Sequence, residues 1–312
     1  MKWTPDQIPD QTDRTALITG ANSGIGFEAA RELAAHGATV VLAARDPERG
    51  QRARDAIARD VPRARLELLE LDLADLGSIR AAAERFADEH DALHLLINNA
   101  GVMALPARTT ADGFEMQIGT NHLGHFALTG LLLDRVTAAG GGRVVTVSSV
   151  LHRRGRIRLD DLHFDEGYDP WRAYGQSKLA NLLFTYELDR RLRAAGRDAI
   201  AAACHPGYAS TNLQAAGPRM ERKPVKTALM RLGNKLIGQS ARVGSWPTLY
   251  AATAPDVEGG DFIGPRGPFE LAGAPKKVRS NDASRDTDTA RRLWTLSEQL
   301  TGVELPLPAP EA

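Results

Sequence analysis

Cysteine is almost absent from this sequence. Cys204 is the single cysteine in 312 residues, and a disulfide within the chain would need two. This scarcity fits a reducing compartment, so we expect a cytoplasmic protein. Because Cys204 lies in the apolar run 199–204, we expect a small buried side chain there rather than a redox group.

A surplus of charge and a long apolar run are missing too. The chain has 39 Lys and Arg against 39 Asp and Glu, which argues against broad electrostatic binding to nucleic acid. No stretch approaches the roughly 18 apolar residues that cross a bilayer. Residues 1–14 are polar and lack the apolar core of a signal peptide. We therefore expect no nucleic-acid partner, no membrane anchor and no metal site.

Short apolar runs alternate with amphipathic segments through the first two thirds of the chain. The runs lie at 15–19, 39–44, 65–71, 93–98, 144–148 and 199–204. Several are nearly uninterrupted hydrophobic residues, which is typical of parallel strands covered on both faces. The sequence therefore predicts an α/β fold, a single Rossmann-type domain over residues 1–312 whose doubly wound parallel sheet has helices on both faces.

The segment from 211 to about 244 breaks this alternation. It contains Gly217-Pro218 and Pro224 together with several Lys and Arg residues. We predict an insertion of short helices there, which forms a small lid over the substrate and excludes water. A C-terminal helix is expected at 284–300.

A glycine-rich loop follows the first predicted strand and leads into a helix. Its residues are Gly20-Ala21-Asn22-Ser23-Gly24-Ile25-Gly26. Glycines permit a tight turn and let backbone N–H groups approach a pyrophosphate at the helix N-terminus. The spacing is T-G-x-x-x-G-x-G rather than G-x-G-x-x-G. A glycine-rich turn without a ligand is the alternative, but the strand–loop–helix context favours dinucleotide binding.

Tyr174 and Lys178 lie four residues apart in a predicted amphipathic helix, which places them on one face. A free tyrosine has a pKa near ~10, too high for efficient proton exchange at neutral pH. An ammonium group nearby favours the phenolate, so we expect Lys178 to lower the pKa of Tyr174. Such a spacing also arises by chance, so the pair needs support from other residues.

Four features in chain order supply that support and resemble the short-chain dehydrogenase/reductase family. They are the glycine loop, the N-N-A-G motif at 98–101, the serines that end strand 144–148, and Tyr174 with Lys178. The resemblance covers residues 15–211 and implies the fold predicted above. Each residue has an ordinary alternative, but Asn121, Ser149, Tyr174 and Lys178 in family order behind the glycine loop favour a catalytic interpretation.

The long segment between Ser149 and Tyr174 narrows the resemblance. This segment and the run Tyr-x-x-Ser-Lys-Leu-Ala-Asn at 174–181 resemble the retinol-dehydrogenase-like branch. Membrane-bound retinol dehydrogenases carry an apolar anchor, which this sequence lacks, so retinoid activity is not carried over.

The resemblance implies a role for each catalytic residue. Tyr174 would exchange a proton with the substrate oxygen, and Ser149 would hydrogen-bond that oxygen. Lys178 would also bind the nicotinamide ribose, and Asn121 would hold a water that links Lys178 to solvent. Ser148 would replace Ser149 if the register differs by one residue.

Cofactor contacts are implied at the ends of several strands. They are Asp72 and Leu73 for the adenine, Asn99, Ala100 and Gly101 near its ribose, and Pro206, Gly207 and Thr211 for the nicotinamide. On local grounds Asp72 is nearly as well explained as a helix N-cap. We expect His205 to be a packing or capping residue, because Tyr174 already supplies the acid.

Arg45 bears on the choice between NADP(H) and NAD(H). NAD-binding relatives usually end the second strand with an acidic residue that binds the ribose, and Ala44 stands there in this chain. Arg45 can pair with a 2′-phosphate, and Ser23 could donate a second hydrogen bond. We therefore expect NADP(H), with NAD(H) as the alternative. The other interpretation of Arg45 is a solvated charge neutralised by Asp46.

The sequence thus predicts an NADP(H)-dependent enzyme that interconverts a small, hydrophobic alcohol with its ketone or aldehyde. Candidate pocket residues are Phe126, Leu151, Tyr208, Leu213, Trp246 and Phe262, although such residues more often belong to the core. A catalytically silent nucleotide sensor or scaffold is the main alternative. A sugar-nucleotide epimerase fits less well, because its G-x-x-G-x-x-G loop is missing. The family implies a homodimer or homotetramer, which the long 149–174 segment would alter.

Overall fold

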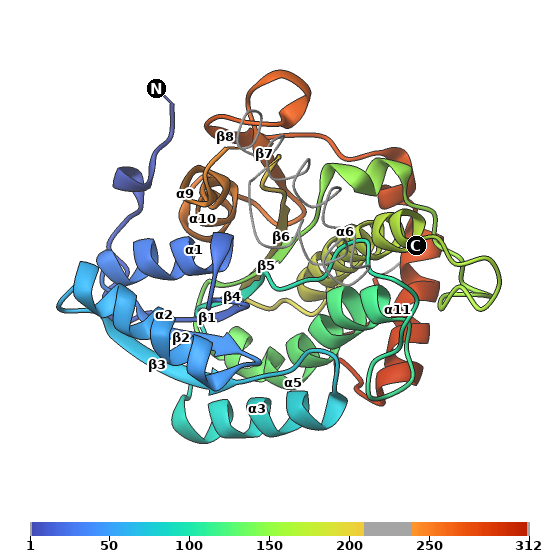
Figure 1. Cartoon of the computed structure of the whole chain (residues 1–312), viewed down its shortest axis with the longest axis horizontal. Coiled ribbons are helices and arrows are strands. Elements are labelled where there is room, and N and C mark those ends of the chain that lie inside the picture. The colour runs from blue at the N-terminus through green and yellow to red at the C-terminus, as the bar shows by residue number, and fades with distance from the viewer. Residues whose placement is uncertain (1, 209–238, 311–312) are drawn as a thin grey trace.

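The computed structural model describes residues 2–208 and 239–310, so Thr211 and most of the predicted lid lie outside the described residues. The described chain forms one eight-stranded sheet in the order β3-β2-β1-β4-β5-β6-β7-β8 (Figure 1). The strands are β1 (Thr15–Thr19), β2 (Thr39–Ala44), β3 (Arg65–Glu70), β4 (Leu95–Asn98), β5 (Gly142–Val147), β6 (Ala199–Cys204), β7 (Phe262–Pro265) and β8 (Pro275–Lys277).

The predicted parallel sheet is confirmed for β1 to β7. Leu17 of β1 lies opposite Val41 of β2 and Leu96 of β4, in parallel register on both sides. Chain order therefore reverses between β1 and β4, and open α/β sheets bind ligands at such a switch point. β8 departs from the prediction because it pairs with β7 antiparallel, as a three-residue edge strand with Pro275 and two lysines.

Helices cover both faces of the sheet, as predicted. Figure 1 shows α1, α2 and α10 on one side and α3, α5 and α11 on the other. The helices are α1 (Gly24–Ala35), α2 (Pro47–Asp60), α3 (Leu76–Glu89), α4 (Met116–Ile118), α5 (Gly124–Ala138), α6 (Pro170–Ala194), α9 (Ala241–Gly244), α10 (Trp246–Thr253) and α11 (Thr287–Thr301). Each face has its own apolar core, because side chains alternate between the faces along every strand.

Aspartates fix where four of these helices begin, including α11, whose N-cap is Asp286. Asp46, Asp75 and Asp169 are the N-caps of α2, α3 and α6, and each carboxylate accepts hydrogen bonds from backbone N–H groups of the first turn. Asp72 is therefore not the cap of α3, which corrects the alternative considered for it. Its carboxylate accepts a bond from the Ala74 N–H at 3.0 Å instead.

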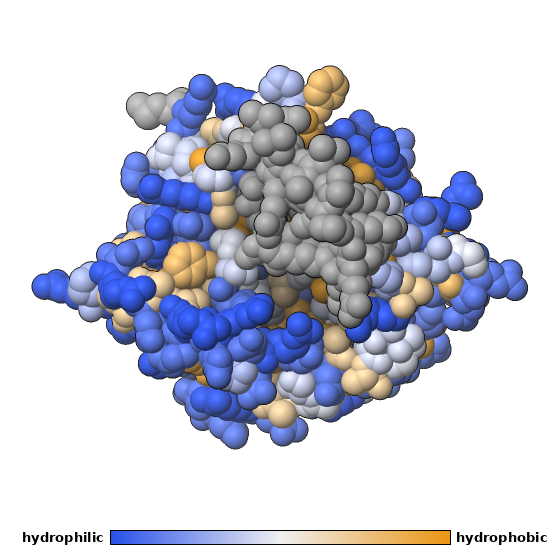
Figure 2. Space-filling model, in the orientation of Figure 1, coloured by the Kyte–Doolittle hydropathy of each residue, from blue (hydrophilic) through white to orange (hydrophobic). Residues whose placement is uncertain are grey.

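The surface of the described residues that Figure 2 shows is mainly polar. On the face in Figure 2, apolar side chains are scattered among hydrophilic ones outside the grey atoms. Trp171 and Phe269 are the exposed large hydrophobic residues, at 50% and 85% exposure. Within residues 2–208 and 239–310, no helix combines the length and the apolar character that crossing a membrane requires.

Cys204 lies in β6 and is fully buried, with its Sγ 3.4 Å from Thr248 Oγ1. Burial raises the pKa of this thiol to about 12, so the thiolate does not form near neutral pH. The predicted small buried side chain is confirmed.

Trp294 anchors α11 against α5 and α6. Its ring lies 5.2 Å from that of Phe126 and 5.9 Å from that of Phe184. The guanidinium of Arg191 sits 4.3 Å over the indole, and 2% of Trp294 is exposed. The C-terminal helix is thus part of the main core.

Trp294→Ala is expected to lower the free energy of unfolding by about 3–5 kcal/mol, because it leaves a cavity among aromatic rings. Urea unfolding followed by circular dichroism measures this. Phe269→Ala is the matched control, since that ring is 85% exposed and its loss should change stability by about 0.5 kcal/mol or less. Equal losses in the two variants would contradict the role of Trp294.

Candidate active site

One cavity of about 630 Å³ runs along the carboxyl ends of the central strands. The glycine loop borders one end, and Ser149, Tyr174 and Lys178 border the other. Every predicted cofactor-binding residue that the structure describes lines this cavity: Gly20, Asn22, Ser23, Gly24, Ile25, Gly26, Arg45, Asp72, Leu73, Asn99, Ala100, Gly101, Tyr174, Lys178, Pro206 and Gly207. Residues far apart in the sequence therefore meet around one space.

The glycine loop borders the cavity closely with its backbone. Gly20 and Gly24 have φ angles of 66° and 60°, a region that glycine adopts without steric cost. A Cβ at Gly26 would lie 2.5 Å from Asn99 Nδ2 and 2.6 Å from Gly20 O. Since α1 begins at Gly24, its first N–H groups have no partner within the helix. This arrangement fits a pyrophosphate, which such N–H groups bind.

Thr19 joins the ends of β1 and β4 beneath this loop. Its hydroxyl accepts hydrogen bonds from the N–H groups of Asn99 and Ala100, both at 2.9 Å. Its carbonyl accepts the Asn99 side-chain amide at 2.8 Å. The floor of the cavity is thereby held to the first strand.

Ser149 and Tyr174 meet at the other end of the cavity. The hydroxyl of Ser149 hydrogen-bonds the phenol of Tyr174, and 4% of Tyr174 is exposed. Ser148 is turned to the other side, where its hydroxyl donates to the carbonyl of Lys178 at 2.7 Å. Of the two serines, Ser149 therefore has the geometry to share a substrate oxygen with Tyr174.

Lys178 lies behind the phenol. Its Nζ is 5.8 Å from the centre of the Tyr174 ring and donates a hydrogen bond to the carbonyl of Val147 at 3.0 Å. The same carbonyl accepts the side-chain amide of Asn181 at 3.2 Å. The end of β5 thus orients the ammonium toward the cavity.

Burial governs the proton affinities of this pair. It raises the pKa of Tyr174 to about 12, and the bond from Ser149 opposes this only in part. It also lowers the pKa of Lys178 to about 8. The expectation that Lys178 lowers the pKa of Tyr174 is wrong for this arrangement, because desolvation of the phenolate outweighs other effects. At neutral pH the phenol keeps its proton, which suits a proton donor.

Asn121 lies in a π-turn, Gly119–Leu123, between α4 and α5. Its Oδ1 accepts the Val102 N–H at 2.8 Å, and its Nδ2 donates to the Val102 carbonyl and to Ser177 Oγ, both at 2.9 Å. The side chain therefore ties the cavity floor to the turn of α6 that carries Lys178.

Arg45 stands at the mouth of the cavity beside the glycine loop. Its side chain is 72% exposed, and its Nε is 3.9 Å from Asp72 Oδ2. Asp46 pairs instead with Arg49, at 3.2 Å, which corrects the interpretation that Asp46 neutralises Arg45. Arg49 also lines the cavity and was missed in the sequence, although it follows Arg45 by one helical turn.

Pro206 and Gly207, the predicted P-G segment, line the cavity after the end of β6. Gly207 has a φ angle of 68°, and a Cβ there would lie 2.4 Å from the Leu271 carbonyl. His205 is buried, with Nε2 3.0 Å from Glu270 Oε2 and Nδ1 accepting the Gly207 N–H at 3.2 Å. His205 is thus a packing and hydrogen-bonding residue, as predicted.

The substrate end of the cavity is largely apolar. Of the residues suggested for it, Leu151 and Tyr208 line the cavity. Phe126, Trp246 and Phe262 belong to the packed interior, and Leu213 lies outside the described residues. Val102, Met103, Val150 and Trp171 are among the lining residues that were not predicted. For Trp171 a signal existed, because it precedes Tyr174 by almost one helical turn.

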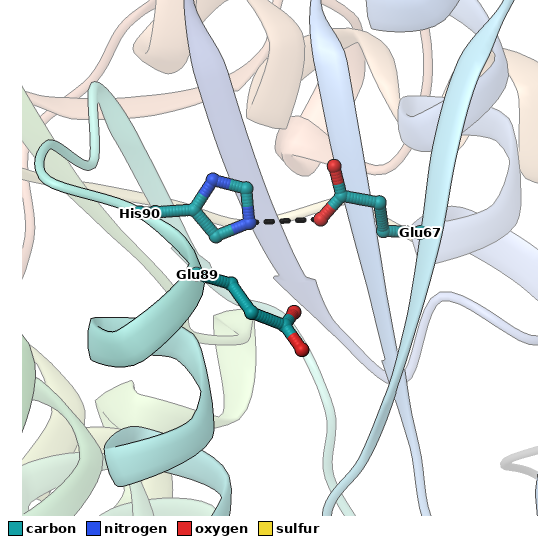
Figure 3. Close-up of side chains that lie close together, drawn as sticks. All are labelled: Glu67, Glu89 and His90. Carbon is teal, nitrogen blue, oxygen red and sulfur yellow. Dashed lines mark hydrogen bonds and ion pairs between the residues drawn. The ribbon is translucent and has the colours of Figure 1, made fainter.

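Among the described residues, one further group carries donors of the kind that bind metals, namely Glu67, Glu89 and His90 (Figure 3). None of the three lines the cavity. His90 Nε2 is 2.8 Å from Glu67 Oε2, and Glu89 pairs with Arg85 at 3.1 Å. These contacts are accounted for by the packing of α3 against β3.

Comparisons with known proteins agree with this geometry. The model of the short chain dehydrogenase family matches residues 14–222. Retinol dehydrogenase 12 of Mus musculus is 41% identical over 300 residues, covering 96% of this chain and 88% of that protein. Polyprenol dehydrogenase of Mus musculus is 41% identical over 306 residues, covering 96% and 87%.

Solved structures with the same fold include two that are similar to this chain in sequence as well. An uncharacterized protein from Mycobacterium Paratuberculosis is 48% identical with a TM-score of 0.81, covering 98% of this chain and 100% of that one. A Beutenbergia cavernae chain assigned as an NAD(P)-dependent gluconate 5-dehydrogenase, with bound NADP, is 26% identical with a TM-score of 0.61. That match covers 80% of this chain and 94% of the other.

Proposed function

The chain belongs to the short chain dehydrogenase family, in its retinol-dehydrogenase-like branch, and from this premise we propose an NADP(H)-dependent reductase and dehydrogenase of carbonyls and alcohols. Its general activity is that of an oxidoreductase. The observation that carries the proposal is one cavity with the glycine loop at one end and Ser149, Tyr174 and Lys178 at the other.

The proposed chemistry is hydride transfer with a matching proton transfer. When bound, a reduced nicotinamide supplies the hydride that adds to the carbonyl carbon. Tyr174 gives its phenolic proton to the carbonyl oxygen, so the C=O becomes an alcohol. Ser149 holds that oxygen, and Lys178 stabilises the phenolate left behind. Alcohol oxidation follows the reverse path, with Tyr174 as the base.

Arg45 supports NADP(H) as the cofactor. It lies at the carboxyl end of β2, where Ala44 provides no carboxylate to repel a 2′-phosphate, and Arg49 adds a second cation to the same wall. NAD(H) remains the alternative, and the ratio of the two dissociation constants tests the choice.

The substrate is proposed to be an apolar small-molecule alcohol or carbonyl, as opposed to a macromolecule. Val102, Met103, Leu151 and Trp171 line the same cavity as Tyr174, and apolar lining residues favour apolar ligands. Two of the similar mouse proteins are named for retinol and polyprenol, both apolar alcohols. A panel of aldehydes, ketones and alcohols with NADPH and NADP is the test. Nucleotide binding without turnover on any of them would favour the sensor alternative.

A cytoplasmic location and a homodimer or homotetramer are also proposed. α11 and residues 303–307 pack on α5 and α6, so a second copy could not contact the part of these two helices that they cover. Light scattering tests assembly, and cell fractionation tests location.

Carbonyl reduction is expected to slow as the pH rises above about 8, where the ammonium of Lys178 loses its proton. Tyr174, with a pKa of about 12, remains protonated through this range. Reduction therefore fails through loss of the cation that stabilises the phenolate. Initial rates of NADPH oxidation across the alkaline range measure this, with circular dichroism as the control for unfolding. A reduction rate that keeps rising above pH 8 would contradict the assignment.

A further inference from the structure

The π-turn Gly119–Leu123 has an unusual hydrogen bond at its centre. The Gly124 N–H donates to the Gly119 carbonyl, five residues back, and such turns occur frequently at functional sites. The carbonyl of Asn121 lies 3.0 Å from the side-chain Nδ1 of His125. Asn121 is fully buried and 1% of His125 is exposed, so the imidazole shares no contact with bulk water.

The other ring nitrogen of His125 lies against Thr19. Nε2 is 2.9 Å from Thr19 Oγ1, the hydroxyl that already accepts N–H bonds from Asn99 and Ala100. A hydroxyl accepts two bonds and donates one. Its proton therefore points to Nε2 or to the Ile97 carbonyl, which is farther away at 3.4 Å. Nε2 is then the acceptor, and Nδ1 carries the proton that is donated to Asn121.

We propose that His125, as the neutral Nδ1–H tautomer, is a positioning residue that couples the end of β1 to Asn121 and so to Lys178. This inference rests on the proposed function for its kinetic consequence. Its structural content, the tautomer and the two bonds, stands independently of that function.

The bonds around His125 close a ring through the cavity floor. Thr19 holds the N–H groups of Asn99 and Ala100, and the chain continues from there to Val102. The backbone of Val102 pairs with the side chain of Asn121. The backbone carbonyl of Asn121 then accepts a hydrogen bond from Nδ1 of His125. His125 then returns to Thr19. The imidazole is thus the single side chain that links the backbone of Asn121 to β1 in this ring.

The residues joined by these hydrogen bonds pack closely against Lys178. A Cβ at Gly101 would lie 3.0 Å from Asn121 Oδ1 and 3.5 Å from Lys178 Nζ. Asn121 also donates to Ser177, the residue before Lys178. A shift of the Asn121 backbone would therefore displace both the cavity floor and the lysine, and small displacements of this kind cost rate.

His125 does not itself exchange protons. Burial and the nearby cation of Lys178 lower its pKa to about 4, and its Nε2 faces a hydroxyl whose acceptor sites are already filled. Burial also lowers the pKa of His122, in the π-turn before α5, to about 3. The geometry therefore assigns His125 to positioning rather than to acid–base catalysis.

Three substitutions separate the two bonds. His125→Phe keeps a ring but removes both bonds, and it is expected to lower kcat by about 10- to 100-fold with a smaller change in KM. His125→Asn keeps a donor near the position of Nδ1 and is expected to recover most of the lost kcat. His125→Gln places an acceptor near Nε2 and is expected to recover less. A kcat for His125→Phe within about twofold of wild type would overturn the proposal.

His122→Phe is the matched control. His122 lies three residues earlier, is equally buried, and bonds Ser297 of α11 at 2.9 Å rather than the active site. It is expected to lower the melting temperature while kcat stays near that of wild type. If both histidine variants lose stability and kcat to the same extent, the role of His125 is merely structural and the proposal fails.

Two measurements do not depend on turnover. Nitrogen-15 spectra of the histidine rings should show the Nδ1–H tautomer for His125 in the wild-type protein, and an Nε2–H tautomer would overturn the proposal. NADPH titration should show weaker binding by His125→Phe than by His122→Phe, and equal binding would count against the coupling. Wild-type protein that binds NADPH but reduces no carbonyl would refute the proposed function and leave the tautomer result standing.

Discussion

Tyr174→Phe is expected to lower kcat for carbonyl reduction by about 100- to 10,000-fold, the usual range for loss of a general acid. The substitution removes one hydroxyl and keeps the ring that fills the site. NADPH binding should stay close to that of wild type, because the rest of the cavity is unchanged. Rates come from NADPH absorbance and affinities from NADPH fluorescence.

Tyr186→Phe provides the matched control for this experiment. Tyr186 lies on the same helix, α6, is also buried, and bonds Ser280 at 2.9 Å, but it does not line the cavity. Its loss should cost about 1 kcal/mol of stability and leave kcat near wild type. Near-normal activity in Tyr174→Phe would refute the mechanism, and equal loss in both variants would point to a general effect of losing a buried hydroxyl.

The parts of the fold that depend on local patterns could be predicted from the sequence. β1 to β6 correspond to short runs that the sequence predicts as strands. The spacing of the glycines at 20–26, after the first of these strands, predicts the dinucleotide-binding loop. Tyr174 and Lys178 share a helix face because helical geometry fixes positions four residues apart. β8 could not be predicted in this way, because Pro275–Lys277 has no apolar alternation and becomes a strand only by pairing with β7.

The electrostatics of the site depend on burial and could not be read from spacing. The sequence places an ammonium near Tyr174, which alone would lower the pKa of the phenol. The structure buries both groups, and the desolvation penalty reverses the direction for the tyrosine. A phenol that is neutral at pH 7 can donate a proton, which is the step that the proposed carbonyl reduction requires.

The π-turn at Asn121 shows a second limit of sequence reasoning. The stretch around it reads as an ordinary helix, since nothing local marks an extra residue in the turn. The bonds that stabilise it reach across 106 positions, from His125 to Thr19. Asn121 itself was identified through the family motif, whereas the residue that positions it became visible only with the tertiary contacts.

Arg45→Asp is expected to weaken NADPH binding by about 10- to 100-fold, which corresponds to the loss of one charge-assisted hydrogen bond. The new carboxylate would also repel a 2′-phosphate and could accept bonds from the ribose hydroxyls of NAD(H). Dissociation constants for NADPH and NADH, measured by fluorescence at several salt concentrations, should therefore move in opposite directions. Unchanged selectivity would refute the cofactor assignment.

Arg52→Asp separates a local contact from a general change in charge. Arg52 lies on α2, is 64% exposed, and pairs with Glu48, but it does not line the cavity. It alters the net charge by the same amount, so a long-range effect would appear equally in both variants. Because Arg52 is exposed and outside the cavity lining, salt weakens its effect on a bound nucleotide, so only Arg45→Asp should change the ratio of NADPH to NADH affinity. The same shift in Arg52→Asp would mean that the field of α2, rather than a contact with Arg45, selects the cofactor.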